Sequence, residues 1–250
     1  MLAVLAAIAA NASAAASAGD NPALPAWIKA RVADDTPRIA TALGLSSLPR
    51  IALSYREGDG PAGLRTIDAE TRDHAIVIRY TGSWQNHSDG ARRAVTRNLA
   101  HELAHSWQRS LGLATESRLF HEGFAEALAI EALRRCADQC EGAPDALARQ
   151  REQDCAYALA LGPVIAGQTD EAHYGCGTVL VLAASAASGE PVRALYRAFA
   201  ATERDAESFL AVAEARAGRA FALSARTFLT ANLTLAGPST VMERLRAGRL

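Results

Sequence analysis

The sequence predicts an α+β fold, with a small β-sheet at the front followed by a predominantly helical portion. Two segments rich in β-branched and aromatic residues, RIALSYRE (50–57) and HAIVIRY (74–80), are the best strand candidates. The Gly- and Pro-rich stretch GDGPAG (58–63) lies between them and predicts a turn or loop. From Asp89 onward, Ala, Leu, Arg and Glu dominate at helical spacing. The order of these segments predicts strands first and helices afterwards.

A helix is also expected ahead of the first strand. The segment PALPAWIKARVADDTPRIATALG (22–44) has apolar residues at helical spacing, prolines near its start and Gly44 as a stop. After the strands, the helical pattern is interrupted at Gly112 and at EGAPD (141–145), LGPVIAGQTD (161–170) and SGEP (188–191). These interruptions predict where successive helices end.

Length and charge limit the organisation and the partners. A chain of 250 residues, 50% hydrophobic, can bury one sizeable core. We expect a single domain over 19–250, with a β-containing part at about 45–85, two central helices at about 89–135 and a helical part at about 143–250. The formal net charge is −1, and Arg is scattered among acids. Such a surface offers no basic field for a phosphate backbone, so nucleic acid is not an expected partner. The oligomeric state is left open.

Residues 1–18 have the pattern of an export signal. Leu2 to Ala10 is apolar, and Ala16-Ser17-Ala18 provides the small residues that a signal peptidase accepts, so cleavage is expected after Ala18. A disordered Ala-rich tail is the alternative, because no Lys or Arg precedes the apolar segment. The segment is far shorter than the roughly 20 residues that a membrane span needs. We therefore expect an exported mature chain, periplasmic or extracellular, without a membrane span.

The cysteines agree with export. An even number is typical of disulfides formed in an oxidising compartment. A zinc–thiolate site is the alternative, but C-x-x-x-C followed by widely spaced single cysteines matches structural zinc patterns poorly. We expect two disulfides, with three possible pairings, among Cys136, Cys140, Cys155 and Cys176.

One predicted helix carries the motif HELAHSW (101–107). Ser88 or Asp89 can cap its start, and Gly112 can end it. Between these limits, apolar residues recur near helical spacing at Val95, Leu99, Leu103 and Trp107.

The spacing inside the motif suits a metal. His101 and His105 are four residues apart, so on a helix they project from one face and can converge on one ion. Glu102 then lies beside the ion, where its carboxylate can take a proton from water. The alternative is an ordinary helix with two surface histidines and a solvated glutamate.

A second helical stretch, FHEGFAEALAIEALRR (120–135), supplies a third ligand candidate. Glu122 follows His105 after 16 intervening residues, and Glu126 lies on the same helix face one turn later. Glu122 can complete a His, His, Glu set with an open position for water. Glu126 can orient a ligand histidine without contacting the metal ion itself. The alternative is that both glutamates are surface charges.

HELAHSW followed by HEGFAEALA resembles the gluzincin metallopeptidases of the aminopeptidase N and leukotriene A4 hydrolase type, whose zinc sites read H-E-x-x-H-x-W and then N-E-G-F-A. The resemblance covers chiefly residues 95–130. It implies a thermolysin-like catalytic unit with one Zn²⁺ per chain, ligands His101, His105 and Glu122, and Glu102 as general base. The chain departs from the family where His121 replaces Asn, where the gap before the third ligand is two residues shorter, and where no G-A-M-E-N-like segment occurs. Aminopeptidase activity therefore does not follow.

A further segment, HYGCGTVL (173–180), is similar to the family's Y-x-x-G. The resemblance implies that the hydroxyl of Tyr174 stabilises the tetrahedral intermediate, with Gly177 at the glycine position. The alternative is a tyrosine that only packs its ring against a neighbouring helix. If Tyr174 has no such role, His173 and His121 are the next candidates.

The sequence thus leads to the hypothesis of an exported zinc metallopeptidase that hydrolyses peptide or protein substrates. HAIVIRYTG (74–82) is the expected edge strand beside the cleft, where a peptide could add by main-chain hydrogen bonds. A non-catalytic binding protein on the same scaffold is one alternative, although an intact Glu102 favours an enzyme. Hydrolysis of a non-peptide substrate is the other. Cleavage specificity is left open.

Overall fold

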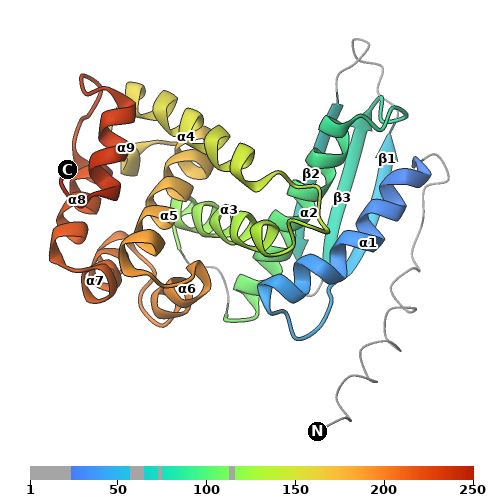
Figure 1. Cartoon of the computed structure of the whole chain (residues 1–250), viewed down its shortest axis with the longest axis horizontal. Helices are drawn as coiled ribbons and strands as arrows, with labels where there is room; N and C mark the ends of the chain where they lie inside the picture. Colours follow the sequence, from blue (N-terminus) through green and yellow to red (C-terminus); the bar gives the residue numbers. More distant parts are fainter. Residues whose placement is uncertain (1–23, 57–64, 73–74, 113–115) are drawn as a thin grey trace, which may run out of the picture.

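The computed structural model has a mixed α+β fold that is mostly helical (Figure 1). The sheet and helix α1 (Ala26–Leu43) lie at one end of the molecule, and helices of the C-terminal half gather at the other. The α2 and α3 helices lie between these two parts. The structure describes residues 24–56, 65–72, 75–112 and 116–250. The expected export signal at 1–18 and the GDGPAG loop lie outside the described residues.

Three strands form the described sheet, in the order β1-β3-β2. Strands β1 (Arg50–Arg56) and β3 (Ala75–Gly82) are the two predicted strands, and they pair in parallel. Strand β2 (Arg65–Arg72), which the sequence pattern did not predict, pairs antiparallel with β3. The expected edge position of 74–82 is therefore wrong. β3 is central because it hydrogen-bonds on both sides, and β2 takes the edge.

Helices α1 and α2 (Asp89–Arg109) form where their sequence patterns predict helices, and they pack on each other. α1 ends at Gly44, whose φ of 75° is the left-handed conformation that glycine adopts without strain. Ser88 caps α2 by accepting a hydrogen bond from the Ala91 amide. A buried hydrogen bond of 2.6 Å from Thr96 Oγ1 to Asp35 Oδ2 links the two helices.

Helix α3 (Arg118–Arg135) makes its closest helix contact through two glycines. A Cβ added to Gly123 would lie 2.6 Å from the Gly177 backbone, and one added to Gly177 would lie 2.4 Å from the Leu119 carbonyl oxygen. Only glycine at both positions permits this approach. The contact holds the start of helix α5 (Gly177–Ser188) directly against α3.

The remaining helices enclose an aromatic core between α3 and the C-terminal half. Phe120 and Phe124 of α3 pack against Phe199 and Phe209 at ring-centroid distances of 5.0–6.0 Å. The breaks predicted around residues 141–145, 161–170 and 188–191 fall between helices. The elements are α4 (Pro144–Leu161), the 3₁₀ helix η1 (Val164–Ala166), the π-helix η2 (Glu171–Cys176), α6 (Val192–Ala200), α7 (Ala206–Ala217), α8 (Arg219–Thr230) and α9 (Pro238–Arg246).

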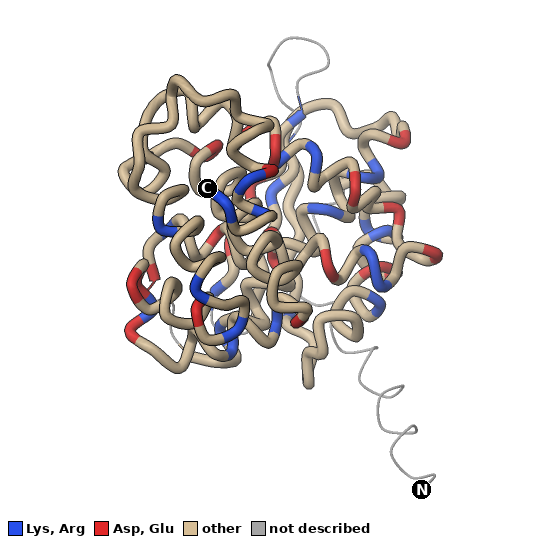
Figure 2. Tube along the Cα trace, turned by 60° about the vertical axis from the view of Figure 1, so that its left-hand side comes forward, with Lys and Arg blue, Asp and Glu red and all other residues tan. Residues whose placement is uncertain are grey.

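Both expected disulfides are present. Cys136 pairs with Cys140 after α3, and Cys155 of α4 pairs with Cys176 of η2. No free thiol remains for the alternative zinc–thiolate site. Two disulfides are compatible with an extracellular location. Among the described helices, none has the length and apolarity needed to cross a membrane. Figure 2 shows Lys and Arg interspersed with Asp and Glu along the chain.

Candidate metal centre

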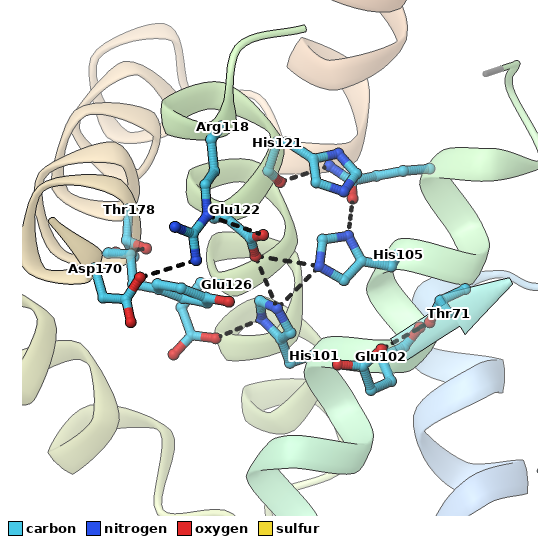
Figure 3. A network of polar contacts seen from close by, with 12 residues as sticks. Thr71, His101, Glu102, His105, Arg118, His121, Glu122, Glu126, Asp170 and Thr178 are labelled. Carbon is cyan, nitrogen blue, oxygen red and sulfur yellow. Dashed lines mark hydrogen bonds and ion pairs between the residues drawn. The ribbon is translucent and has the colours of Figure 1, made fainter. Parts of the chain in front are cut away.

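Three side chains from α2 and α3 converge on one point (Figure 3). The Nε2 atoms of His101 and His105 lie 2.9 Å apart. The Glu122 Oε2 atom lies 3.2 Å from the first of these nitrogens and 3.3 Å from the second. Both histidines are 7% exposed, so they are not the surface histidines of the alternative interpretation.

The triangle of donor atoms fits a tetrahedral metal ion. Bonds of about 2.0–2.1 Å at tetrahedral angles separate neighbouring ligand atoms by about 3.3 Å. The observed separations of 2.9–3.3 Å are close to that value. Two imidazoles and one carboxylate suit zinc and related transition ions and leave a fourth position open. The group of His101, His105 and Glu122 is therefore able to hold a metal ion.

The outer nitrogens of the histidines are each held by an acceptor. His101 Nδ1 donates to Glu126 Oε2 at 2.8 Å, and His105 Nδ1 donates to Gln108 Oε1 at 2.8 Å. The Gln108 amide is oriented by its own hydrogen bond to the His121 carbonyl oxygen, at 3.1 Å. These acceptors assign the proton to Nδ1 in both rings. Each Nε2 then faces the triangle and, when it carries no proton, can offer its lone pair to a metal ion.

Glu126 is itself buried and paired. It is 3% exposed, and its Oε1 accepts from Arg151 Nε at 2.6 Å. Burial raises the pKa of Glu126, but the hydrogen bond from His101 and the Arg151 charge outweigh it and lower this pKa to about 2. Glu126 is therefore a charged carboxylate behind His101, and not a surface charge.

The triangle favours positive charge. Burial lowers the pKa of His101, yet hydrogen bonds to Glu122 and Glu126 more than offset it and raise the pKa to about 10. Burial also raises the pKa of Glu122, but its hydrogen bonds with both histidines take it well below the ordinary range. Burial lowers the pKa of His105, and the His101 charge adds to that. A cation at this point, whether a proton or a metal ion, balances the negative charges of Glu122 and Glu126.

Glu102 lies outside the triangle and faces the sheet (Figure 3). Its Oε2 accepts a hydrogen bond of 2.8 Å from Thr71 Oγ1, and its backbone oxygen accepts a second one of 3.1 Å from the same hydroxyl. Thr71 belongs to edge strand β2, which the sequence pattern did not predict. The hydroxyl therefore fixes one carboxylate oxygen of Glu102.

Tyr174 reaches the site from the π-helix η2. Its ring centroid lies 5.4 Å from that of His101, and the Arg151 guanidinium lies 5.6 Å from the same tyrosine ring. Burial and the neighbouring Glu122 carboxylate raise the pKa of the Tyr174 hydroxyl. The Gly123–Gly177 contact explains this proximity, since it holds the segment after Tyr174 against the helix of Glu122.

His121 and His173, the alternative candidates to Tyr174, lie in different surroundings. The His121 ring stacks on His105 at 4.3 Å, and its Nδ1 donates to the buried Glu116 carboxylate at 3.1 Å. His173 is 5% exposed, and its Nδ1 has no hydrogen-bond partner within the described part of the chain. His121 therefore lies at the metal centre.

Sequence reasoning missed four residues that the fold brings to the site: Thr71, Gln108, Arg118 and Arg151. Thr71 could have been found only by recognising β2. Arg118 lies four residues before Glu122 on α3, and this spacing alone predicts that the two share a helix face. Comparisons with protein-family models, curated proteins and solved structures found no match to this chain.

Proposed function

We propose that the chain is an exported zinc metallopeptidase of the gluzincin type, with a thermolysin-like catalytic unit. The observation that carries the proposal is the convergence of two imidazole nitrogens and one carboxylate oxygen, with separations of 2.9–3.3 Å. His101, His105 and Glu122 would hold one zinc ion. When bound, zinc supplies a Lewis acid that polarises a carbonyl and lowers the pKa of water.

Glu102 is the general base in this proposal. Its Oε1 takes a proton from the attacking water and then delivers it to the nitrogen of the leaving amine. The hydrogen bond from Thr71 keeps the carboxylate in one orientation during both transfers. A protein that only binds zinc has no need for a carboxylate fixed in this way, so the Thr71 contact supports an enzyme over a binding scaffold.

Tyr174 is the proposed donor to the oxyanion that develops on the scissile carbonyl. A tyrosine hydroxyl is protonated at neutral pH, so it can donate a hydrogen bond. The edge strand β2 is the proposed docking site for the peptide backbone, in place of 74–82. Thr71 places the end of β2 beside Glu102, which supports this choice.

The test compares the zinc-loaded parent with Glu102→Gln on pooled fluorogenic peptides. The amide cannot accept a proton, so we expect unchanged zinc content and a turnover lower by about 10²–10⁴-fold. Cleavage by the variant at the parental rate would remove Glu102 as the base. Zinc binding by a parent that cleaves no peptide would favour the binding protein, and ester hydrolysis alone would favour the non-peptide hydrolase.

A further inference from the structure

A guanidinium lies at the solvent side of the metal centre and takes no part in the proposed zinc chemistry. Arg118 Nη2 pairs with Asp170 Oδ1 at 2.8 Å, and Arg118 Nε lies 4.0 Å from Glu122 Oε1. Figure 3 shows Arg118 between these two carboxylates. Arg118 also hydrogen-bonds the Tyr174 hydroxyl, although burial and Glu122 keep the pKa of that hydroxyl raised. Arg118 therefore touches both the third ligand candidate and the proposed oxyanion donor.

The partner of Arg118 is easily displaced. The Arg118 side chain is 52% exposed and that of Asp170 is 71% exposed. Ion pairs this exposed contribute little to stability. A guanidinium has five N–H donors in a planar fork that fits a carboxylate, and only one pairs with Asp170 at hydrogen-bond distance in the described chain. An incoming carboxylate can therefore replace Asp170 at small cost.

The location also favours an anion. Glu122 Oε1 lies 4.0 Å from Arg118 Nε, whereas Glu122 Oε2 belongs to the metal triangle. A metal ion held by Oε2 leaves less of the Glu122 negative charge to balance Arg118. The exposed Asp170 offers only part of the remaining compensation, since solvent screens it.

We propose that Arg118 binds a carboxylate of the substrate, in a residue next to the scissile bond. This inference rests on the proposed peptidase function. The distance of 4.0 Å to Glu122 limits the reach of Arg118, because one extended residue spans only about 3.3–3.6 Å. The carboxylate is either the free C-terminus of the substrate or an acidic side chain at that residue, and the two sources share one recognition chemistry.

The chain contains a matched control for this arginine. Arg134 lies on the same helix, is 48% exposed and pairs with Asp145, which is 72% exposed. The Arg134 guanidinium donates to Asp145 Oδ1 at 3.1 and 3.2 Å. Arg134→Gln thus removes a comparable ion pair from α3 away from the metal centre.

The test measures peptide retention and needs no turnover. Zinc-loaded Glu102→Gln protein is mixed with pools of acetylated tetrapeptides, randomised at the first three positions, that end in a carboxylate or an amide. Amidated pentapeptide pools carrying Glu or Gln at the fourth position form the second arm. Bound peptides are counted by ultrafiltration and mass spectrometry. Peptide turnover by the parent protein is measured separately. A failure of the peptidase proposal can therefore be told apart from a failure of the Arg118 proposal.

We expect retention about 10- to 100-fold higher for the carboxylate member of one pair, the range for a charge-assisted hydrogen bond. The C-terminal pair would identify a free carboxylate and the Glu/Gln pair an acidic side chain. Adding Arg118→Gln should abolish the preference, Arg134→Gln should keep it, and Asp170→Asn should raise it by roughly 2- to 5-fold. Zinc content and melting temperature should stay near parental values in all three. No carboxylate preference in either arm, no retention at all, or a preference that survives Arg118→Gln would overturn the proposal.

Discussion

The two histidines of the candidate metal centre are held in different ways. His101 donates to Glu126, a buried carboxylate that is itself paired with Arg151, whereas His105 donates to the neutral amide of Gln108. A carboxylate behind a ligand histidine raises the basicity of that ring more than an amide does. The outer hydrogen-bond partner of His101 is therefore charged. The outer partner of His105 is neutral and mainly fixes the orientation of the ring.

The same asymmetry extends to the surroundings. Arg151 of α4 contacts Glu126, bonds Asp154 at 2.7 Å and lies over the Tyr174 ring. The Cys155–Cys176 disulfide joins α4 to the π-helix that carries this tyrosine. On the other side, His105 stacks on His121. Changes on the His101 side should therefore alter stability, metal affinity and turnover together.

Among the substitutions that would break this asymmetry, we expect Glu126→Gln to have the largest effect on stability and metal affinity. Glu126→Gln leaves the partly buried Arg151 beside a neutral group, with Asp154 as its remaining charged partner. Losing one member of a buried ion pair costs about 3 kcal/mol or more of unfolding free energy. We also expect metal affinity to fall about 10- to 100-fold. Calorimetric melting and competition with a zinc chelator measure the two effects.

Gln108→Ala is the matched comparison on the His105 side. It removes two neutral hydrogen bonds, those to His105 and to the His121 carbonyl oxygen, so the loss of unfolding free energy should be about 2 kcal/mol, below that of Glu126→Gln. Equal losses for Glu126→Gln and Gln108→Ala, in either measurement, would contradict the assigned asymmetry.

A somewhat smaller effect is expected at Tyr174, and it concerns turnover alone. Tyr174→Phe keeps the ring packed on His101 but removes the hydroxyl. Loss of one oxyanion donor lowers kcat by about 10²-fold, roughly 3 kcal/mol, with little change in zinc content or melting temperature. Steady-state kinetics on the zinc-loaded enzyme measure it.

His121→Phe serves as the comparison, because it replaces the ring that stacks on His105. If Tyr174→Phe stays within about twofold of the parental kcat while His121→Phe loses activity, the oxyanion donor belongs to the other side of the site.

The elements that local spacing specifies were predicted correctly. Helix α1 with its Gly44 stop, the capped helix α2 and the helix of Glu122 follow from apolar periodicity and terminal residues. The convergence of the two motif histidines requires only a spacing of four residues on one helix.

The missed features depend on tertiary contacts. Strand β2 has the sequence RTIDAETR, in which polar residues dominate because an edge strand is partly solvated on both faces. Without β2, neither the central place of β3 nor the Thr71–Glu102 contact could be predicted. The Cys155–Cys176 pairing and the Arg118–Asp170 ion pair join segments far apart in the chain. No local pattern encodes such pairs.

The central claim, a three-residue metal centre, is tested most directly by metal content. Purified protein, dialysed against zinc and then against metal-free buffer, is analysed by mass spectrometry of its elements. We expect about one zinc per chain for the parent, and the same for His87→Ala, which changes an exposed histidine beside Trp27. His105→Ala should lose stoichiometric zinc because it removes one donor of the triangle. A zinc-free parent, or a His105→Ala protein that retains one zinc per chain, would contradict the account.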